Sequence, residues 1–141
     1  MNTLELDGER ALFENKIQAL AVVCQENERP LGGLLGLVDW RFGGVISQSV
    51  RTGFITGRTG ECCYIPLVKT GKTFHLIVIG AGHAEKHGHR LAPPVESVKA
   101  LQKNLLSLKL KQTGISRSDF GGQQDEYFSR HFKGVPLWIV T

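Results

Sequence analysis

The sequence has few cysteines, no long apolar run and only a mild excess of positive charge. Its three cysteines include the adjacent pair Cys62 and Cys63, and no C-x-x-C spacing occurs, so they predict neither a disulfide framework nor a cysteine-ligated zinc site. No apolar stretch reaches the ~18 residues that cross a bilayer. Residues 1–7 lack the basic start and apolar core of a signal peptide, which predicts a cytoplasmic protein without membrane attachment.

The composition is that of an ordinary globular chain. With 141 residues, of which 41% are hydrophobic and 21% charged, the sequence predicts one domain, residues 1–141, with a sizeable core. The formal net charge of +4 fits weak attraction to a polyanion and equally fits an ordinary solvated surface. Composition therefore leaves the function open.

Residues 74–82, with the sequence FHLIVIGAG, suggest the centre of the fold. The run from Leu76 to Ile79 is apolar at successive positions, which a strand tolerates when helices cover both faces of its sheet. The sequence therefore predicts an α/β fold in which this is a central strand. The turn Gly80-Ala81-Gly82 lies at its carboxyl end, where open α/β sheets bind their ligands.

Hydrophobic periodicity and turn residues place the other elements. Lys69-Thr70-Gly71-Lys72 predicts a hairpin turn into the central strand. Asp39 is placed as the N-cap of a helix, because its carboxylate can accept hydrogen bonds from first-turn amides. Pro93-Pro94 opens a helix with one apolar stripe. The remaining strands are expected at 3–6, 17–24, 61–67, 112–117 and 135–140, and the helices at 9–14, 31–38, 39–53, 94–108 and 123–131.

The turn Gly80-Ala81-Gly82 has the first two glycines of a dinucleotide-binding fingerprint. The third position is Glu85, and the next clear helix begins only at Pro94, so a pyrophosphate would lack the helix amides that normally hold it. A glycine-rich turn still lets backbone approach a phosphate. Two interpretations stay open: a ligand-binding turn that includes His83, and a plain tight turn.

A metal site is a second possible interpretation of the same region. His83, Glu85, His87 and His89 alternate along the chain, so an extended segment would point all four the same way. Their charged and glycine neighbours are more typical of an exposed loop. The sequence therefore predicts no metal ion and no cofactor.

Two groups of polar residues are candidates for chemistry. Asp39-Trp40-Arg41 is either a carboxylate at the ligand site beside a stacking ring, or a helix cap, a core indole and a surface arginine, and the second interpretation is favoured. Asp119, Asp125 and Glu126 are more typical of a solvated helix start than of an acid/base pair. No nucleophile-elbow, kinase or zinc-protease motif occurs.

Four landmarks follow one another in an order and spacing similar to the N-terminal domain of the leucyl aminopeptidase family. They are Arg29-Pro30-Leu31, residues 36–41, residues 54–61 and the strand with its turn, residues 76–82. The resemblance runs over nearly the whole chain and is clearest from residue 17 to residue 82. It implies a single domain with a macro-domain-like fold, a mixed sheet between helices.

The resemblance also bears on function. The family's two divalent metals, its lysine and its Asn-Thr-Asp-Ala-Glu-Gly-Arg segment belong to a C-terminal domain, and no part of this sequence matches them. The implied protein is a non-catalytic interaction or assembly module that binds a protein partner or self-associates. One alternative is a binder of ADP-ribose or a nucleotide, through Gly80, Ala81, Gly82, His83 and Asp39, because related macro domains hold ADP-ribose at the strand ends. A second is DNA binding through Arg51, Arg58, Lys69, Lys72 and Lys86.

Overall fold

The computed structural model describes residues 1–84 and 91–141. Its sheet has the strand order β1-β6-β5-β2-β4-β3, in which β3 alone runs antiparallel to its neighbour. The elements are β1 (Asn2–Leu4), α1 (Gly8–Phe13), β2 (Ala19–Cys24), α2 (Gly33–Arg41), α3 (Val45–Arg51), β3 (Cys62–Lys69), β4 (Lys72–Gly80), α4 (Val95–Leu108), β5 (Thr113–Ser116), the 3-10 helix η1 (Ser118–Phe120), α5 (Asp125–His131) and β6 (Leu137–Val140). Among the described residues, no helix has the length and apolarity needed to span a bilayer.

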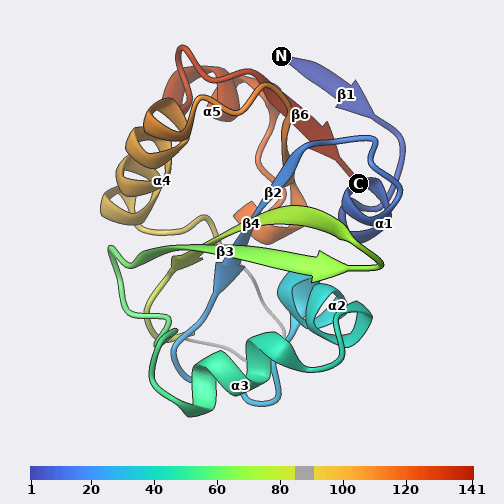
Figure 1. The fold of residues 1–141 in the computed structure, drawn as a ribbon. Coiled ribbons are helices and arrows are strands. Elements are labelled where there is room, and N and C mark those ends of the chain that lie inside the picture. The colour runs from blue at the N-terminus through green and yellow to red at the C-terminus, as the bar shows by residue number, and fades with distance from the viewer. Residues whose placement is uncertain (85–90) are drawn as a thin grey trace.

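Helices cover both faces of the sheet (Figure 1). On one face Leu20 and Val22 of β2 pack with α1, α2 and α3. On the other face Ala19 and Ala21 pack with α4 and α5. Alternate residues of one strand thus enter two separate cores, as the period of two dictates. The predicted α/β class, a macro-domain-like mixed sheet between helices, is confirmed.

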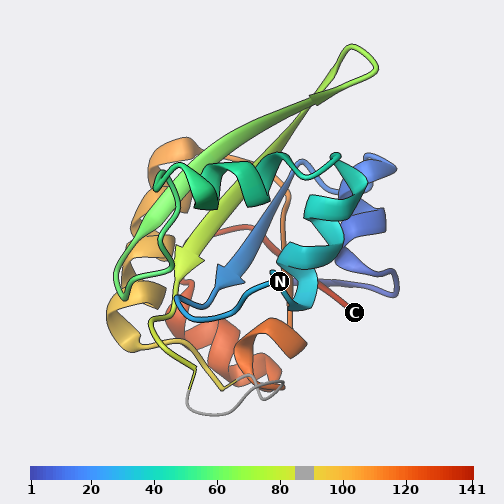
Figure 2. The same ribbon diagram turned by 90° about the horizontal axis from the view of Figure 1, so that it is seen from below.

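Strand β4 confirms the prediction drawn from its apolar run. Residues 76–79 are 0% exposed, and β4 lies between β2 and β3. The hairpin is confirmed too, because Thr70 and Gly71, at φ 51° and 75°, form a two-residue turn of the left-handed kind that antiparallel strands favour. The β3–β4 hairpin extends well beyond the rest of the sheet (Figure 2).

Strand β3 forms an open edge of the sheet, and Pro66 lies in the middle of it. The Gly80 N–H donates to the Glu61 carbonyl at 2.8 Å, so odd-numbered β3 residues direct their backbone groups toward β4. Pro66 then falls where an N–H would point outward to a new strand. Since proline has none, this edge is protected against sheet extension by a second chain.

The predicted helix from Asp39 to residue 53 is wrong in its start. Helix α2 continues through Asp39 to Arg41, and the chain then turns through Gly43 and Gly44, at φ 69° and 82°, before α3 begins. Two successive left-handed residues cannot continue an α-helix, and glycine adopts them without a steric penalty. The two glycines therefore set the boundary that the apolar spacing did not reveal.

Asp39 nevertheless caps α3, from the preceding helix. Its carboxylate accepts hydrogen bonds from the amides of Ile46 and Ser47 at 2.8 and 3.0 Å, and from the Ser47 hydroxyl at 2.5 Å.

The expectation that Trp40 is a core indole is wrong, because its side chain lies on the outer face of α2 and is 77% exposed.

Thr113 carries a buried hydroxyl without a partner in the described chain. The residue is 0% exposed, and its Oγ1 accepts and donates no hydrogen bond. Thr113→Val keeps the shape and removes the desolvated hydroxyl, so we expect the free energy of unfolding to rise by about 1 kcal/mol in urea titrations. Thr113→Ser, which keeps the hydroxyl and loses the methyl group, should lower it. A less stable valine variant would show that the hydroxyl is satisfied.

Candidate functional site

The sheet has a point where neighbouring strands lead to opposite faces. Strands β2 and β5 are adjacent and parallel. Helix α2, which follows β2, packs Leu34 and Leu35 on one face, and η1 and α5, which follow β5, pack Phe120 and Phe128 on the other. Open α/β sheets bind ligands outside the carboxyl ends of such strands. We call this place the switch point and define it by residues 25–32 and 117–124.

A glycine pair lies in or directly at the end of each loop of the switch point. Gly32 and Gly33 lead into α2, with Gly33 at φ 59°. Gly121 and Gly122 follow η1, both at φ 73°, and a Cβ added to Gly122 would meet no atom within 4 Å. The backbone at Gly122 is therefore open to close approach. Sequence reasoning did not single out these pairs, although a Gly-Gly step soon after a buried strand could have indicated them.

Asp119 links the two loops. Its carboxylate accepts a hydrogen bond from the Val23 amide at 3.0 Å and one from the Leu34 amide at 3.4 Å. The residue is 1% exposed, so the prediction that it belongs to a solvated helix start is wrong. The pairing of β2 with β5 ends at Ala21 and Ile115, which leaves the Val23 amide to a side-chain acceptor.

The turn Gly80-Ala81-Gly82 is in close contact with two other backbone segments, one at Cys24 and one at Gly57-Arg58. The Ala81 amide donates to the Cys24 carbonyl at 3.0 Å, and the Gly82 amide to the Gly57 carbonyl at 2.8 Å. A Cβ on Gly80 would lie 2.0 Å from the Arg58 carbonyl oxygen. Loop packing alone therefore requires a glycine at Gly80 and occupies the amides of Ala81 and Gly82, while a ligand role for these residues stays a prediction.

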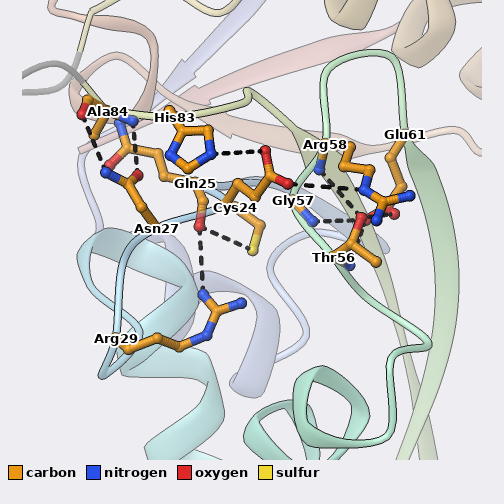
Figure 3. A network of polar contacts seen from close by, with 11 residues as sticks. Cys24, Gln25, Asn27, Arg29, Thr56, Gly57, Arg58, Glu61, His83 and Ala84 are labelled. Atoms are coloured by element: carbon orange, nitrogen blue, oxygen red, sulfur yellow. Dashed lines mark hydrogen bonds and ion pairs between the residues drawn. The ribbon is translucent and has the colours of Figure 1, made fainter.

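Polar side chains reinforce the same junction (Figure 3). The Glu26 carboxylate lies 3.4 Å from Nε2 of His83 and 3.7 Å from Nε of Arg58. The Asn27 side chain donates to the carbonyl of Ala84 at 3.1 Å and accepts from its amide at 2.7 Å. These contacts fix His83 and Arg58, both well exposed, beside the end of β2.

The other predicted site residues are Asp39 and those of the metal hypothesis. The carboxylate of Asp39 is hydrogen-bonded to α3, and its ligand role stays a prediction. Of the metal hypothesis, only His83 is described, since Glu85, His87 and His89 lie outside the described residues. Within the described ranges, no group of three or more metal-ligating side chains comes together.

The two strand thiols are poorly suited to nucleophilic chemistry. Burial, with the neighbouring Cys63, raises the pKa of Cys62 to about 11. Burial and then the charge of Glu61 also raise the pKa of Cys63. Because the thiolate is the reactive form, both side chains are largely protonated and unreactive near neutral pH.

Comparison with known proteins gives a fold. No family model and no curated protein matches the chain. The macrodomain of Mycobacterium tuberculosis DarG matches over 99% of this chain and 98% of its own, with a TM-score of 0.64 at 13% identity. The chain has a macrodomain fold.

Two further solved structures share this macrodomain fold. Thermosipho africanus DarTG in complex with ADP-ribose matches over 92% of this chain and 39% of its own, with a TM-score of 0.59 at 11% identity. A tomato leucine aminopeptidase mutant matches over 100% of this chain and 32% of its own, with a TM-score of 0.60 at 14% identity. The macro-domain-like part of the family resemblance is thus confirmed, and the aminopeptidase part is supported by a partial structural match.

Proposed function

We propose that the chain binds ADP-ribose, or a closely related nucleoside diphosphate, at the switch point. The observation that carries the proposal is the pair of glycine-bearing loops, after β2 and after β5, at the divergence of a macrodomain fold. A structural neighbour was solved with ADP-ribose, which supports this ligand class. The comparisons favour it over the assembly-module interpretation, for which they give no support.

The N-terminus of α2 and the glycine backbone of the two loops can contact a diphosphate at specific residues. Helix α2 directs the positive end of its dipole toward the switch point. Two of its first amides are already engaged, Gly32 by the Glu28 carboxylate at 3.0 Å and Leu34 by Asp119. At Gly122 the amide already donates to the Arg117 carbonyl at 2.8 Å, but a Cβ there would meet no atom within 4 Å, so the Cα side of this residue is open to a phosphate. We therefore expect phosphate oxygens to approach beside Gly33 and Gly122, with Glu28 opposing them electrostatically.

Calorimetric titration with ADP-ribose tests the proposal through a matched pair of variants. Gly122→Asn and Gly122→Asp have nearly the same size, and both residues tolerate the left-handed backbone at φ 73°. Their difference reports the added carboxylate, which repels a diphosphate. We expect Gly122→Asp to bind about tenfold more weakly than Gly122→Asn, which corresponds to about 1.4 kcal/mol. Glu28→Gln, which removes an opposing charge, should bind more tightly than the wild type.

Two results would contradict the proposal: no heat of binding at millimolar ADP-ribose, or equal affinities of the Asp and Asn variants.

A second assay incubates the wild-type protein with an ADP-ribosylated peptide. Release of free ADP-ribose in that assay would overturn the non-catalytic role that the aminopeptidase resemblance implied, and would add hydrolysis to binding.

A further inference from the structure

The opposite edge of the sheet, where β2, β5 and β6 begin, is rich in lysine. We call it the amino edge and define it by residues 14–18, 109–112 and 132–136. Its lysines are all exposed, and within the described residues none makes an ion pair. The acid in these segments, Glu14, is paired with Arg10 at 3.0 Å. The lysines are Lys16, Lys109, Lys111 and Lys133.

A groove of about 610 Å³ opens between these segments. Its lining, within the described chain, contains no carboxylate and combines carboxamides with apolar groups and one cation. The lining residues are Asn2, Asn15, Ile17, Gln18, Lys111, Gln112, Pro136 and Trp138. A volume of this size lies in the range of ordinary ligand sites.

Backbone contacts fix the walls of the groove relative to one another. The Gln18 side chain accepts a hydrogen bond from the Lys111 amide at 2.8 Å, and the Gln18 amide donates to the Gln112 carbonyl at 2.9 Å. Trp138 is half-buried: it packs against the core beneath α1 and also lines the groove. The carboxamides of Asn2 and Asn15 make no hydrogen bond within the described residues, so they are free to contact a ligand.

We propose that the amino edge binds single-stranded nucleic acid. Lysines supply the phosphate contacts that dominate such affinity. Carboxamides offer the paired donor and acceptor that base edges require, and an indole gives a surface on which a base stacks. An acidic peptide has no base to stack on the indole, and a lipid surface would require protruding apolar side chains rather than recessed ones.

This surface lies at the opposite edge from the switch point, so the two sites are independent. It also differs from the DNA hypothesis drawn from the sequence, which used residues on other elements; of those, Arg58 is exposed at the carboxyl edge, and Lys69 donates to the Arg41 carbonyl. Saturating ADP-ribose should therefore leave nucleic-acid binding unchanged.

Fluorescence anisotropy with a labelled single-stranded oligothymidylate tests the proposal. The variant Lys16→Gln with Lys111→Gln removes two charges from the amino edge, and the control Lys99→Gln with Lys103→Gln removes two exposed charges from α4. We expect about tenfold weaker binding for the first and less than about twofold for the control. The slope of log K against log salt should become shallower by about 1.4 for the first, at about 0.7 per lost phosphate contact.

Tryptophan fluorescence distinguishes base contact from general polyanion binding. The chain has two tryptophans, so Trp40→Phe leaves Trp138 as the emitter. We expect the oligonucleotide to quench this emission, whereas heparin, a polyanion without bases, should not. The proposal is overturned by absence of binding at low salt, by equal losses in both double variants, or by oligonucleotide binding that leaves Trp138 emission unchanged.

Discussion

Gly80→Ala is expected to lower the free energy of unfolding by about 3 kcal/mol, the upper range for an overpacked site. The added Cβ would lie 2.0 Å from the Arg58 carbonyl oxygen and 2.6 Å from the Gly57 carbonyl carbon. Both are backbone atoms, which cannot rotate away as the end of a side chain can. Ser97 on α4 also donates to the Gly80 carbonyl at 2.6 Å, so the strand end cannot shift freely to relieve the clash. Urea unfolding measures the change.

Gly60→Ala is the matched control for this prediction. Gly60 lies in the same junction at φ 86°, and a Cβ there would meet no atom within 4 Å. Only left-handed backbone strain should act, at a cost of about 1–2 kcal/mol. If Gly80→Ala were no more destabilising than Gly60→Ala, the close packing of the three segments would be incorrect.

The stability and the ADP-ribose affinity of the Gly80→Ala variant together separate the two interpretations of the Gly80-Ala81-Gly82 turn. A glycine that serves loop packing affects stability first, and ligand affinity only as a consequence. A glycine that serves ligand approach would affect ADP-ribose affinity in a protein of unchanged stability. Because the turn's amides are engaged by Cys24 and Gly57, we expect the first pattern.

Local periodicity predicted most of the fold. The run at residues 76–79 predicted a strand covered on both faces, and the Thr70-Gly71 turn predicted its hairpin partner. Pro93-Pro94 and the apolar stripe after them predicted α4, whose buried positions include Val98, Leu101 and Leu105. These features depend on residues a few positions apart, which is the range over which a single sequence carries information.

The site depends on contacts between distant residues, which local pattern does not specify. Asp119 accepts from Val23 across 96 positions, and nothing near Asp119 in the sequence predicts that it is buried. Asp39 was recognised as a cap, but the break at Gly43 and Gly44 placed it one helix earlier. The switch point itself follows from strand order, which sequence reasoning did not provide.

Strand order also explains why the net charge did not reveal a binding surface. The formal net charge of +4 is modest, yet the segments of the amino edge concentrate lysines without matching acids. The opposite edge, at the carboxyl ends of the parallel strands, carries acidic side chains. Among them are the partly exposed Glu26 and the buried Asp119. A diphosphate and a nucleic-acid strand therefore encounter different fields on one small domain.

Glu61 should make the junction beside the switch point sensitive to pH. Burial alone would raise the pKa of Glu61, but hydrogen bonds from the Thr56 hydroxyl and from the amides of Gly57 and Thr56, with the charge of Arg58, lower it below its usual value of 4.5. The carboxylate accepts these bonds at 2.5 to 3.0 Å. A lowered folded-state pKa means that the stabilisation is fully present above pH 4.5 and is lost as the pH falls through the folded value.

We expect Glu61→Ala to lower the free energy of unfolding at pH 7 by about 2 kcal/mol, because two amides lose a charged acceptor. Glu61→Gln keeps one acceptor oxygen and should lose about 1 kcal/mol. The decisive measurement is the wild-type minus Gln difference in the free energy of unfolding, followed in urea as the pH falls from 7 through the folded-state pKa of Glu61, below which the protonated side chain is neutral like Gln. That difference should shrink toward zero in acid, whereas a constant difference would mean that Glu61 stabilises the junction through its shape rather than its charge.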